Sequence, residues 1–408
     1  RMWLRQQNRF RRKLYTPLKD EKKGDCMKFY INARYLIVPI SSLITILGIV
    51  LGGIYAWTGV FLFGIYTVID TLTKNIHLRA ETNETGESYG IKKFQYSVMY
   101  VMLPIFILLQ VVLAWRLYQY TSGALIQSSD LYGLTFESGI ITTHLIGAVL
   151  SASLWAGLGI IYGHELSHNK KEGFFVSRLI MALSGASHFT YAHVYNHHLD
   201  LGHEDDPATA PRGRNVYAHT WLSHAGQSKY SYDLEKKRLN NKGKNFLSLD
   251  NRWILGYLYS LPSVFLFIWS GGLVGLLALI VVWSLSNFLL EALNFMGHYG
   301  LIRKEGEVEH RHSWDNDSVF TSWFFIEIGR QCDHHVRGET YFWELDDVGG
   351  PNYGIGYFSL FVLTLVPSLF RSFVKKHLDH WDLHYATDEE REIAKKFDQS
   401  DLGLAQLN

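Results

Sequence analysis

Histidine is the residue type in this chain whose spacing could do chemistry, because most of its 19 histidines stand just beyond long apolar segments. In the stretch HELSH, His164 and His168 are four residues apart, so both imidazoles would point from one face of a helix. Glu165 follows His164, as in helical zinc proteases, but the histidines further along the chain disfavour a soluble zinc protease. The pair is a candidate part of a metal site.

A second group of histidines lies in the stretch HVYNHH. Helical spacing predicts that His193 and His197 share a face, while the adjacent His198 points toward a second metal ion. Three histidines within six residues seldom arise as plain surface. Metal binding is therefore the better interpretation of this stretch.

The remaining candidates stand nearer the C-terminus. His298, in NFMGHYGL, directly follows an apolar segment, and RQCDHH supplies His334 and His335. Asp333 beside them is a candidate acceptor that would fix the tautomer of an imidazole. Gln331 stands three and four residues before the two histidines, where a third histidine would complete a triad on one helical face.

Eight histidines in four segments are more than one zinc site uses, because such a site takes three or four protein ligands. Two metal ions are the simpler expectation, and imidazole-rich ligation suits iron, copper, nickel or zinc. The two cysteines, Cys26 and Cys332, form no C-x-x-C pair, so no iron–sulfur or rubredoxin-type module is expected within the chain.

The elements that must position these histidines are long uncharged apolar segments. Hydrophobic residues make up 48% of the 408-residue chain and charged residues 19%, and uncharged blocks of about 20 residues are typical of membrane-spanning helices. The blocks cover residues 35–69, 94–115, 138–163 and 253–290, and the first and last are double length, with glycine turns at 51–53 and 270–272. We therefore predict six spans. A further apolar segment, 351–370, is broken by Pro367 and is expected to lie in the core or the membrane interface.

The predicted fold is an all-α integral membrane bundle of six transmembrane helices with a histidine-rich helical cap on the cytoplasmic side. Residues 1–34 hold eleven Lys or Arg against three acidic residues, which places the N-terminus in the cytoplasm. The chain is interpreted as one membrane domain, 1–408, made of a basic segment (1–34), four spans (35–163), a histidine-rich segment (164–252), two spans (253–290) and a cytoplasmic cap and tail (291–408).

The net charge of +1 gives no reason to expect nucleic acid as a partner. The basic N-terminal segment is better explained by the anionic surface of membrane lipid.

Several motifs in a fixed order carry a family resemblance. They are HELSHNKK, HVYNHH, DPATAPRG (206–213), LEKKRLNNKGKNFLSLDN (234–251), NFMGHYGL, HSWDND (312–317) and CDHH, with HWDLHYAT (380–387) similar to a xylene-type tail. With these motifs the chain resembles the membrane-bound non-haem di-iron monooxygenases, specifically the alkane 1-monooxygenase and xylene monooxygenase hydroxylase group, which is related to the fatty acid desaturases. The resemblance implies two iron ions, O2 as co-substrate, and hydroxylation of a terminal or benzylic methyl group of a medium-chain alkane or alkyl aromatic to a primary alcohol.

Residue by residue, the resemblance implies metal ligands at eight positions. They are His164, His168, His193, His197, His198, His298, His334 and His335. It also implies that Asp206 and His312 support ligands from outside. Relatives usually have histidine at the position of Gln331, so this glutamine is expected either to bind iron through its amide oxygen or to leave the position to water. His188 is expected to be structural, and Glu291 and Glu327 either tune a ligand imidazole or are ordinary helix-surface acids.

The expected partners are a hydrophobic substrate from the bilayer and a rubredoxin or ferredoxin-type electron donor with its NAD(P)H reductase, at a bacterial inner membrane with the active site on the cytoplasmic side. A basic face could dock an acidic donor, although the bias of positive residues toward the cytoplasm explains it equally well. Its residues are Lys170, Lys171, Arg212, Arg214, Lys236, Lys237 and Arg238. Two alternatives stay open: a di-iron fatty acyl desaturase or decarboxylase, and a non-catalytic metal-binding membrane protein that transports or senses iron.

Overall fold

The first apolar block folds as the predicted helical hairpin. In the computed structural model, which describes residues 28–73 and 88–399, a helix from Lys28 to Leu51 contains η1 (Arg34–Leu36) and α3 (Ile37–Leu51). The chain reverses at Gly52 and Gly53, whose φ angles of 77° and 54° lie in the left-handed region that glycine tolerates. It returns through η2 (Gly53–Trp57) and α4 (Thr58–Leu72). The predicted turn at 51–53 is confirmed, whereas most of the basic segment 1–34 lies outside the described residues.

The next two apolar helices are joined by a β-hairpin. The helices are α5 (Lys92–Thr121) and α6 (Thr142–Ser167), and the strands are β1 (Ser128–Leu131) and β2 (Leu134–Glu137). The strands pair antiparallel with Ser128 opposite Glu137. The turn residues Tyr132 and Gly133 have φ angles of 51° and 80°, and two positive φ angles are what a two-residue hairpin turn needs to match the twist of its strands. The fold is mostly helical, as predicted, but the all-α description misses this hairpin.

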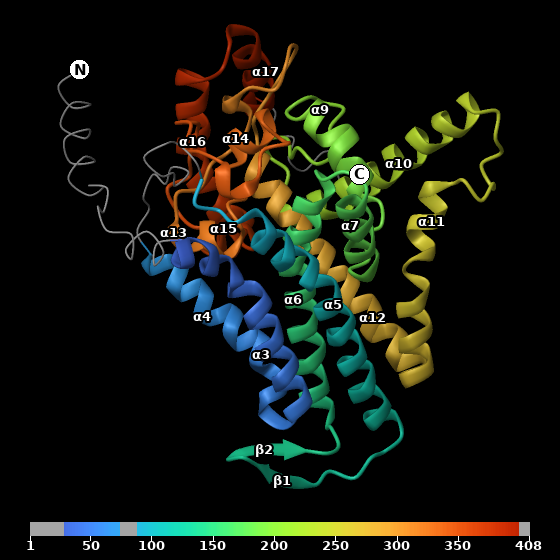
Figure 1. Cartoon of the computed structure of the whole chain (residues 1–408). Helices are drawn as coiled ribbons and strands as arrows, with labels where there is room; N and C mark the ends of the chain where they lie inside the picture. The colour runs from blue at the N-terminus through green and yellow to red at the C-terminus, as the bar shows by residue number, and fades with distance from the viewer. Residues whose placement is uncertain (1–27, 74–87, 400–408) are drawn as a thin grey trace.

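The last apolar block also reverses direction. α11 (Arg252–Leu258) leads into α12 (Leu261–His298), where Gly272 has a φ of 53° and a ψ of −130°, outside the helical region. Ser260, at the start of α12, donates to the Ala182 carbonyl at 3.0 Å, whereas Thr121, at the far end of α5, donates to the Ser270 carbonyl at 3.2 Å. The two halves of α12 therefore run in opposite directions, as the glycine turn predicted (Figure 1).

By length and composition, five helices in the described residues are apolar enough to cross a membrane. They are Lys28–Leu51, Gly53–Leu72, Lys92–Thr121, Thr142–Ser167 and Arg252–His298. The fifth is 47 residues long, more than twice the length of about 20 that one crossing needs, and it contains the reversal. Large apolar side chains point outward from it, including Phe265 and Trp269, each 73% exposed. Apolar surface of this extent is typical of an integral membrane protein.

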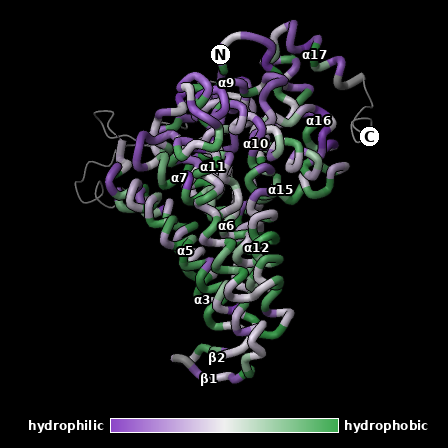
Figure 2. The backbone as a smooth tube through the Cα atoms, turned by 90° about the vertical axis from the view of Figure 1, so that its right-hand side faces the viewer, coloured by the Kyte–Doolittle hydropathy of each residue, from purple (hydrophilic) through white to green (hydrophobic). Residues whose placement is uncertain are grey.

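The remaining helices and loops form a polar cap at one end of the apolar bundle, opposite the β-hairpin, and Figure 2 shows this division by hydropathy. The cap contains α7 (Glu172–Leu183), α8 (Phe189–Ala192), η3 (His193–His197), α9 (His198–Asp200), α10 (Val216–Asn241), η4 (His310–His312), α13 (Val319–Phe324), α14 (Gln331–Val336), η5 (Phe342–Glu344), α15 (Tyr357–Thr364), α16 (Pro367–His384) and α17 (Asp388–Gln399). Pro367 is the first residue of α16, a position where its missing N–H has no helical partner. The apolar segment 351–370 is therefore split between two short helices.

Close packing of α6 against α12 fixes the ends of both helices at the cap. A Cβ added at Gly157 of α6 would lie 2.6 Å from Cδ1 of Leu289 in α12 and 3.1 Å from the Cα of Ser286, so a larger residue would have to displace the leucine or push the helices apart. His164 stands in the last turn of α6 and His298 ends α12. The helix contact therefore sets the distance between two of the predicted ligands.

Candidate metal centre

The structure brings all eight predicted ligand histidines together in the cap, in two adjacent groups. The five-histidine cluster is His164, His168, His193, His198 and His334, and the three-histidine cluster is His197, His298 and His335. Within each cluster, one ring nitrogen of every histidine lies within 4.8 Å of the others. The clusters adjoin through His198 and His335, whose ring centroids are 4.4 Å apart.

A π-helical turn divides the HVYNHH histidines between the two clusters. η3 is a π-helix, and the backbone N–H of His198 donates to the carbonyl of His193, five residues earlier. A π-turn aligns residues five apart, whereas an α-helix aligns residues four apart. The Nε2 atoms of His193 and His198 therefore lie 3.0 Å apart, and His197 joins the other cluster. The sequence predicted that His198 would point to the second site, but the π-turn exchanges the two neighbours: His198 joins His193, and His197, whose ring centroid lies 5.4 Å from that of His193, belongs to the three-histidine cluster.

The donor atoms of the five-histidine cluster fit a bound cation. The Nε2 atoms of His168 and His193 lie 3.1 Å apart, close to the His193–His198 separation. Two nitrogens bound at about 2.1 Å to one cation at right angles would lie about 3.0 Å apart. Several ring nitrogens in the clusters have no hydrogen-bonding partner, among them Nε2 of His334 and Nδ1 of His335. Buried nitrogens are normally paired, so a metal ion would complete them.

Burial keeps these imidazoles in the form that binds metal. Desolvation lowers the pKa of His334 to about 4, and it holds the pKa of His193 and His198 well below the ordinary value. Neutral imidazole has a free lone pair at neutral pH, whereas imidazolium has none.

Asp206 contacts the three-histidine cluster through His197. Its Oδ2 lies 2.8 Å from Nδ1 of His197 and also accepts a hydrogen bond from the Thr209 hydroxyl at 2.6 Å. Its Oδ1 accepts from the backbone N–H of Ala208 at 3.0 Å. A carboxylate on Nδ1 fixes the tautomer that leaves Nε2 free for a metal ion.

The side chains of Asp333 and His312 have partners other than the cluster imidazoles, although the backbone of His312 hydrogen-bonds to the imidazole of His298. Both oxygens of Asp333 accept from the Arg337 guanidinium, one turn along α14, and one accepts from the backbone N–H of Asp346 at 2.7 Å. The side chain of His312 lies against Glu390, with 3.3 Å between Nε2 and Oε1. Asp333 is thus paired with Arg337, four residues further on, and His312 is paired with Glu390 of α17.

Gln331 lines a cavity together with all three histidines of the three-histidine cluster and with His164 and His193 of the five-histidine cluster. Its amide nitrogen donates to the Ile328 carbonyl at 2.9 Å. A Cβ added at Gly297, next to His298, would lie 3.7 Å from the Gln331 amide carbon. The glutamine therefore stands beside the cluster that has fewer imidazoles.

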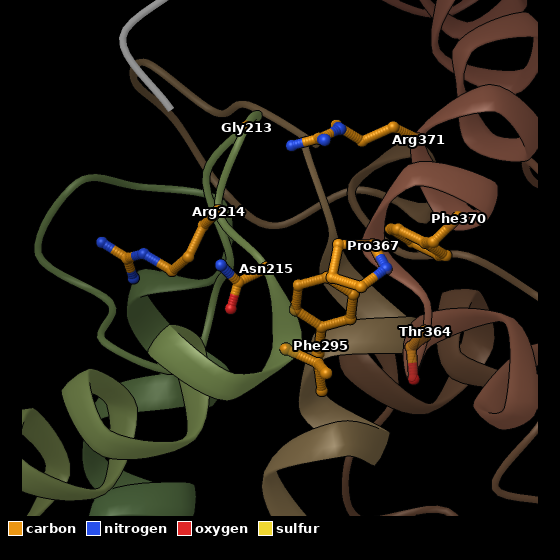
Figure 3. Close-up of a pocket in the computed structure, with 9 residues that line it drawn as sticks. Gly213, Arg214, Asn215, Phe295, Thr364, Pro367, Phe370 and Arg371 are labelled. Carbon is orange, nitrogen blue, oxygen red and sulfur yellow. The ribbon is translucent and has the colours of Figure 1, made fainter. Parts of the chain in front are cut away.

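The cavity beside the histidines has an apolar wall toward the bundle. Ile160, Leu290 and Ile328 contribute to this wall. The cavity measures about 20 Å³, which is room for about one water molecule. Figure 3 shows a different hollow, lined by Phe295 and by Arg371 among others, which contains no histidine of either cluster. The cavity beside the histidines is therefore too small to hold a hydrocarbon chain.

Two further carboxylates have partners other than the cluster imidazoles. Glu327 accepts from the Tyr35 hydroxyl at 2.9 Å and from Arg34 at 3.2 Å. Glu291 lies near His188 and His224. Sequence reasoning missed His224, because the two histidines of α10, His219 and His224, are five residues apart, a spacing that does not put them on one face of an α-helix.

Comparison with known proteins gives consistent matches. The family model described as fatty acid desaturase matches residues 141–360. Alkane 1-monooxygenase of Pseudomonas putida is 28% identical over 246 residues, 58% of this chain and 61% of that protein. Alkane 1-monooxygenase of Ectopseudomonas oleovorans is 30% identical over 274 residues, 63% of this chain and 68% of that protein. The xylene/toluene monooxygenase hydroxylase component XylM of Pseudomonas putida is 26% identical over 368 residues, 88% of this chain and 93% of that protein. The match to the first of these relatives spans less than two thirds of its length.

Proposed function

Because the chain belongs to the fatty acid desaturase family, within the group of alkane and xylene monooxygenases, we propose that it is a membrane di-iron monooxygenase that hydroxylates a hydrocarbon. The observation that supports this most directly is the pair of adjoining, buried histidine clusters. Two neighbouring imidazole sites suit a two-metal centre, since one zinc site would use at most four of these histidines.

The five-histidine cluster holds one iron ion and the three-histidine cluster holds the other. Bound iron supplies the redox chemistry that reduces dioxygen, with one oxygen atom inserted into a C–H bond and the other released as water. Asp206 keeps His197 in the tautomer that directs Nε2 toward the three-histidine cluster. Gln331 either offers its amide oxygen to that cluster or leaves the position to a water molecule.

The substrate is a medium-chain alkane or an alkyl aromatic, hydroxylated at a terminal or benzylic methyl group to a primary alcohol. The support is the apolar wall of the cavity, formed by Ile160, Leu290 and Ile328 among others. Such a wall binds a hydrocarbon by burial and offers no hydrogen bonds to a polar substrate. Since the cavity has room for about one water molecule, these side chains move apart when a hydrocarbon enters.

Electrons come from a separate rubredoxin or ferredoxin-type protein with its NAD(P)H reductase. Part of the basic face is already paired, because Arg212 binds Asp382 and Arg238 binds Glu235. Four exposed lysines stay available to an acidic donor. They are Lys170, Lys171, Lys236 and Lys237.

The helices cross a bacterial inner membrane six times, with the cap and its clusters in the cytoplasm. The two halves of the 47-residue fifth helix would supply the fifth and sixth crossings. Positive residues in the cap-side segments support this orientation.

A fatty acyl desaturase or decarboxylase is the second candidate, because the matching family model is described as fatty acid desaturase. The two functions differ in product. A desaturase gives an alkene from a fatty acyl chain, whereas a hydroxylase gives a primary alcohol from an alkane.

The test uses the full chain in lipid nanodiscs, loaded with iron and supplied with NADPH, a ferredoxin and its reductase. Octane or p-xylene should give a primary alcohol whose oxygen comes from ¹⁸O₂. His335→Ala should abolish the product, while His203→Gln, which changes a partly exposed histidine outside both clusters, should retain it. At most one iron per chain together with no alcohol from either substrate would refute the proposal.

A further inference from the structure

A third group of metal-binding side chains lies outside both histidine clusters. His188 precedes α8, His224 lies in the middle of α10, and Glu291 lies in the second half of α12. One potential ligand atom from each of them lies within 4.8 Å of the others. Three elements that are distant in sequence therefore converge on one point.

The two imidazoles of this group have nitrogens without partners. His188 is 1% exposed, and neither of its ring nitrogens has a hydrogen-bonding partner; nor has Nδ1 of His224. A neutral imidazole carries one N–H donor and one lone pair, and buried polar atoms are normally paired. Burial also lowers the pKa of both histidines, so their lone pairs are free to bind a cation.

The carboxylate of Glu291 is oriented but lacks a positive partner. It accepts hydrogen bonds from the Ser223 hydroxyl at 2.6 Å, the Gln227 amide at 2.9 Å and the Asn294 amide at 3.1 Å. Among the described residues, the basic side chain that pairs with this carboxylate is that of buried His219, whose Nε2 lies 4.0 Å from Oε2 of Glu291. A buried carboxylate held by neutral donors alone suits a cation.

We propose that His188, His224 and Glu291 bind one divalent transition-metal ion, separate from the two ions of the histidine clusters. Two imidazoles and one carboxylate form a ligand set used for zinc and for non-haem iron(II), with further positions left for water. The bound ion links α8, which leads directly into η3, to α10 and α12. This site does not depend on the hydroxylase function.

The first test counts metal ions in the purified full chain by mass spectrometry. The wild type should hold one more ion per chain than His188→Gln or His224→Gln, and the control His203→Gln should match the wild type. Equal counts in the wild type and in folded His224→Gln would overturn the third site. Three ions in the wild type and two in the variant would support the third site as well as the di-iron proposal. One ion in the wild type and none in the variant would support the third site and refute the di-iron proposal.

A second measurement keeps the proposal testable if the glutamine variants do not fold. His224→Cys in cobalt-loaded protein should show a thiolate-to-cobalt charge-transfer band that the wild type and His203→Cys lack. Absence of this band in folded, cobalt-loaded His224→Cys would show that residue 224 does not contact a metal ion and would overturn the proposal.

Discussion

Replacing Asp206 by asparagine should weaken metal binding at the three-histidine cluster. The carboxylate faces donors on both sides: Oδ2 accepts from His197 and Thr209, and Oδ1 accepts from the backbone N–H of Ala208. An asparagine has one acceptor oxygen and one NH2 group. Either orientation therefore sets the NH2 group against a donor, at Ala208 or at the His197 side.

The size of the effect follows from what the mismatch does to His197. If the NH2 group faces His197, the ring must accept through Nδ1 and carry its proton on Nε2, the nitrogen directed at the cluster. Loss of such a supporting carboxylate typically lowers metal affinity about 10–100-fold, or about 1.4–2.7 kcal/mol. If the NH2 group faces Ala208 instead, one buried donor loses its acceptor, which costs about 1–3 kcal/mol of folding stability.

The assay is a chelator competition on the purified full chain, read as separate affinities for the individual ions. Asp206→Asn should lower the affinity for the ion of the three-histidine cluster and leave the affinity for the ion of the five-histidine cluster unchanged. Asp205→Asn is the matched control, because the Asp205 side chain is 77% exposed and faces His203 rather than a cluster histidine. Wild-type affinities in folded Asp206→Asn, with unchanged thermal stability, would refute the orienting role.

Three further predictions concern other parts of the molecule. Gln331→His should raise the affinity of the three-histidine cluster for its ion by at least about tenfold in the same competition assay, on the scale of other changes near a metal. An unchanged affinity would count against the position of Gln331 beside this cluster. Gly157→Ala should lower the unfolding free energy by about 1–3 kcal/mol through overpacking, whereas Gly64→Ala, with nothing within 4 Å of the added Cβ, should not destabilise the protein in thermal denaturation. Partial burial raises the pKa of Glu390, but hydrogen bonds led by that from His312 outweigh it and bring the pKa to about 2. Its stabilisation is therefore present at neutral pH and lost as the pH falls from about 4.5 to 2, so Glu390→Gln should lower the melting temperature at pH 7 more than at pH 3, and equal losses would contradict this.

The residues that meet at the centre were predictable where local spacing and position along the chain decide the outcome. The glycine turns at 51–53 and 270–272 interrupt uncharged blocks, and the reversals at Gly52 and Gly272 follow from that pattern. His164 and His298 lie at the cap ends of α6 and α12. Because an even number of antiparallel segments brings both helix ends to the same side of the bundle, the two histidines were expected to lie close together.

Other features depend on choices that sequence spacing does not determine. The π-turn at His193–His197 differs from an α-helix by one residue per turn, and nothing in HVYNHH selects it. Asp333 binds Arg337, four residues further on; that spacing favours an ion pair, while CDHH places imidazoles next to the same carboxylate, so spacing alone does not choose between the two partners. His224 meets Glu291 only through the packing of α10 on α12, a long-range contact that no local motif encodes.

Because of the π-turn, the response of the two histidine clusters to a change of chain length depends on the number of residues within that turn. It holds one residue more than an α-helical turn, so removing Tyr195, whose side chain is exposed, would return His193 and the original His198 to a spacing of four. An α-helix aligns residues four apart, so after this deletion the two imidazoles would still lie on one face and the residues that follow would keep their direction. Removing a residue from a regular α-helix instead turns everything after it by about 100°. The extra residue of the π-turn is therefore the place in this stretch where a change of chain length would leave the imidazoles of both clusters in position.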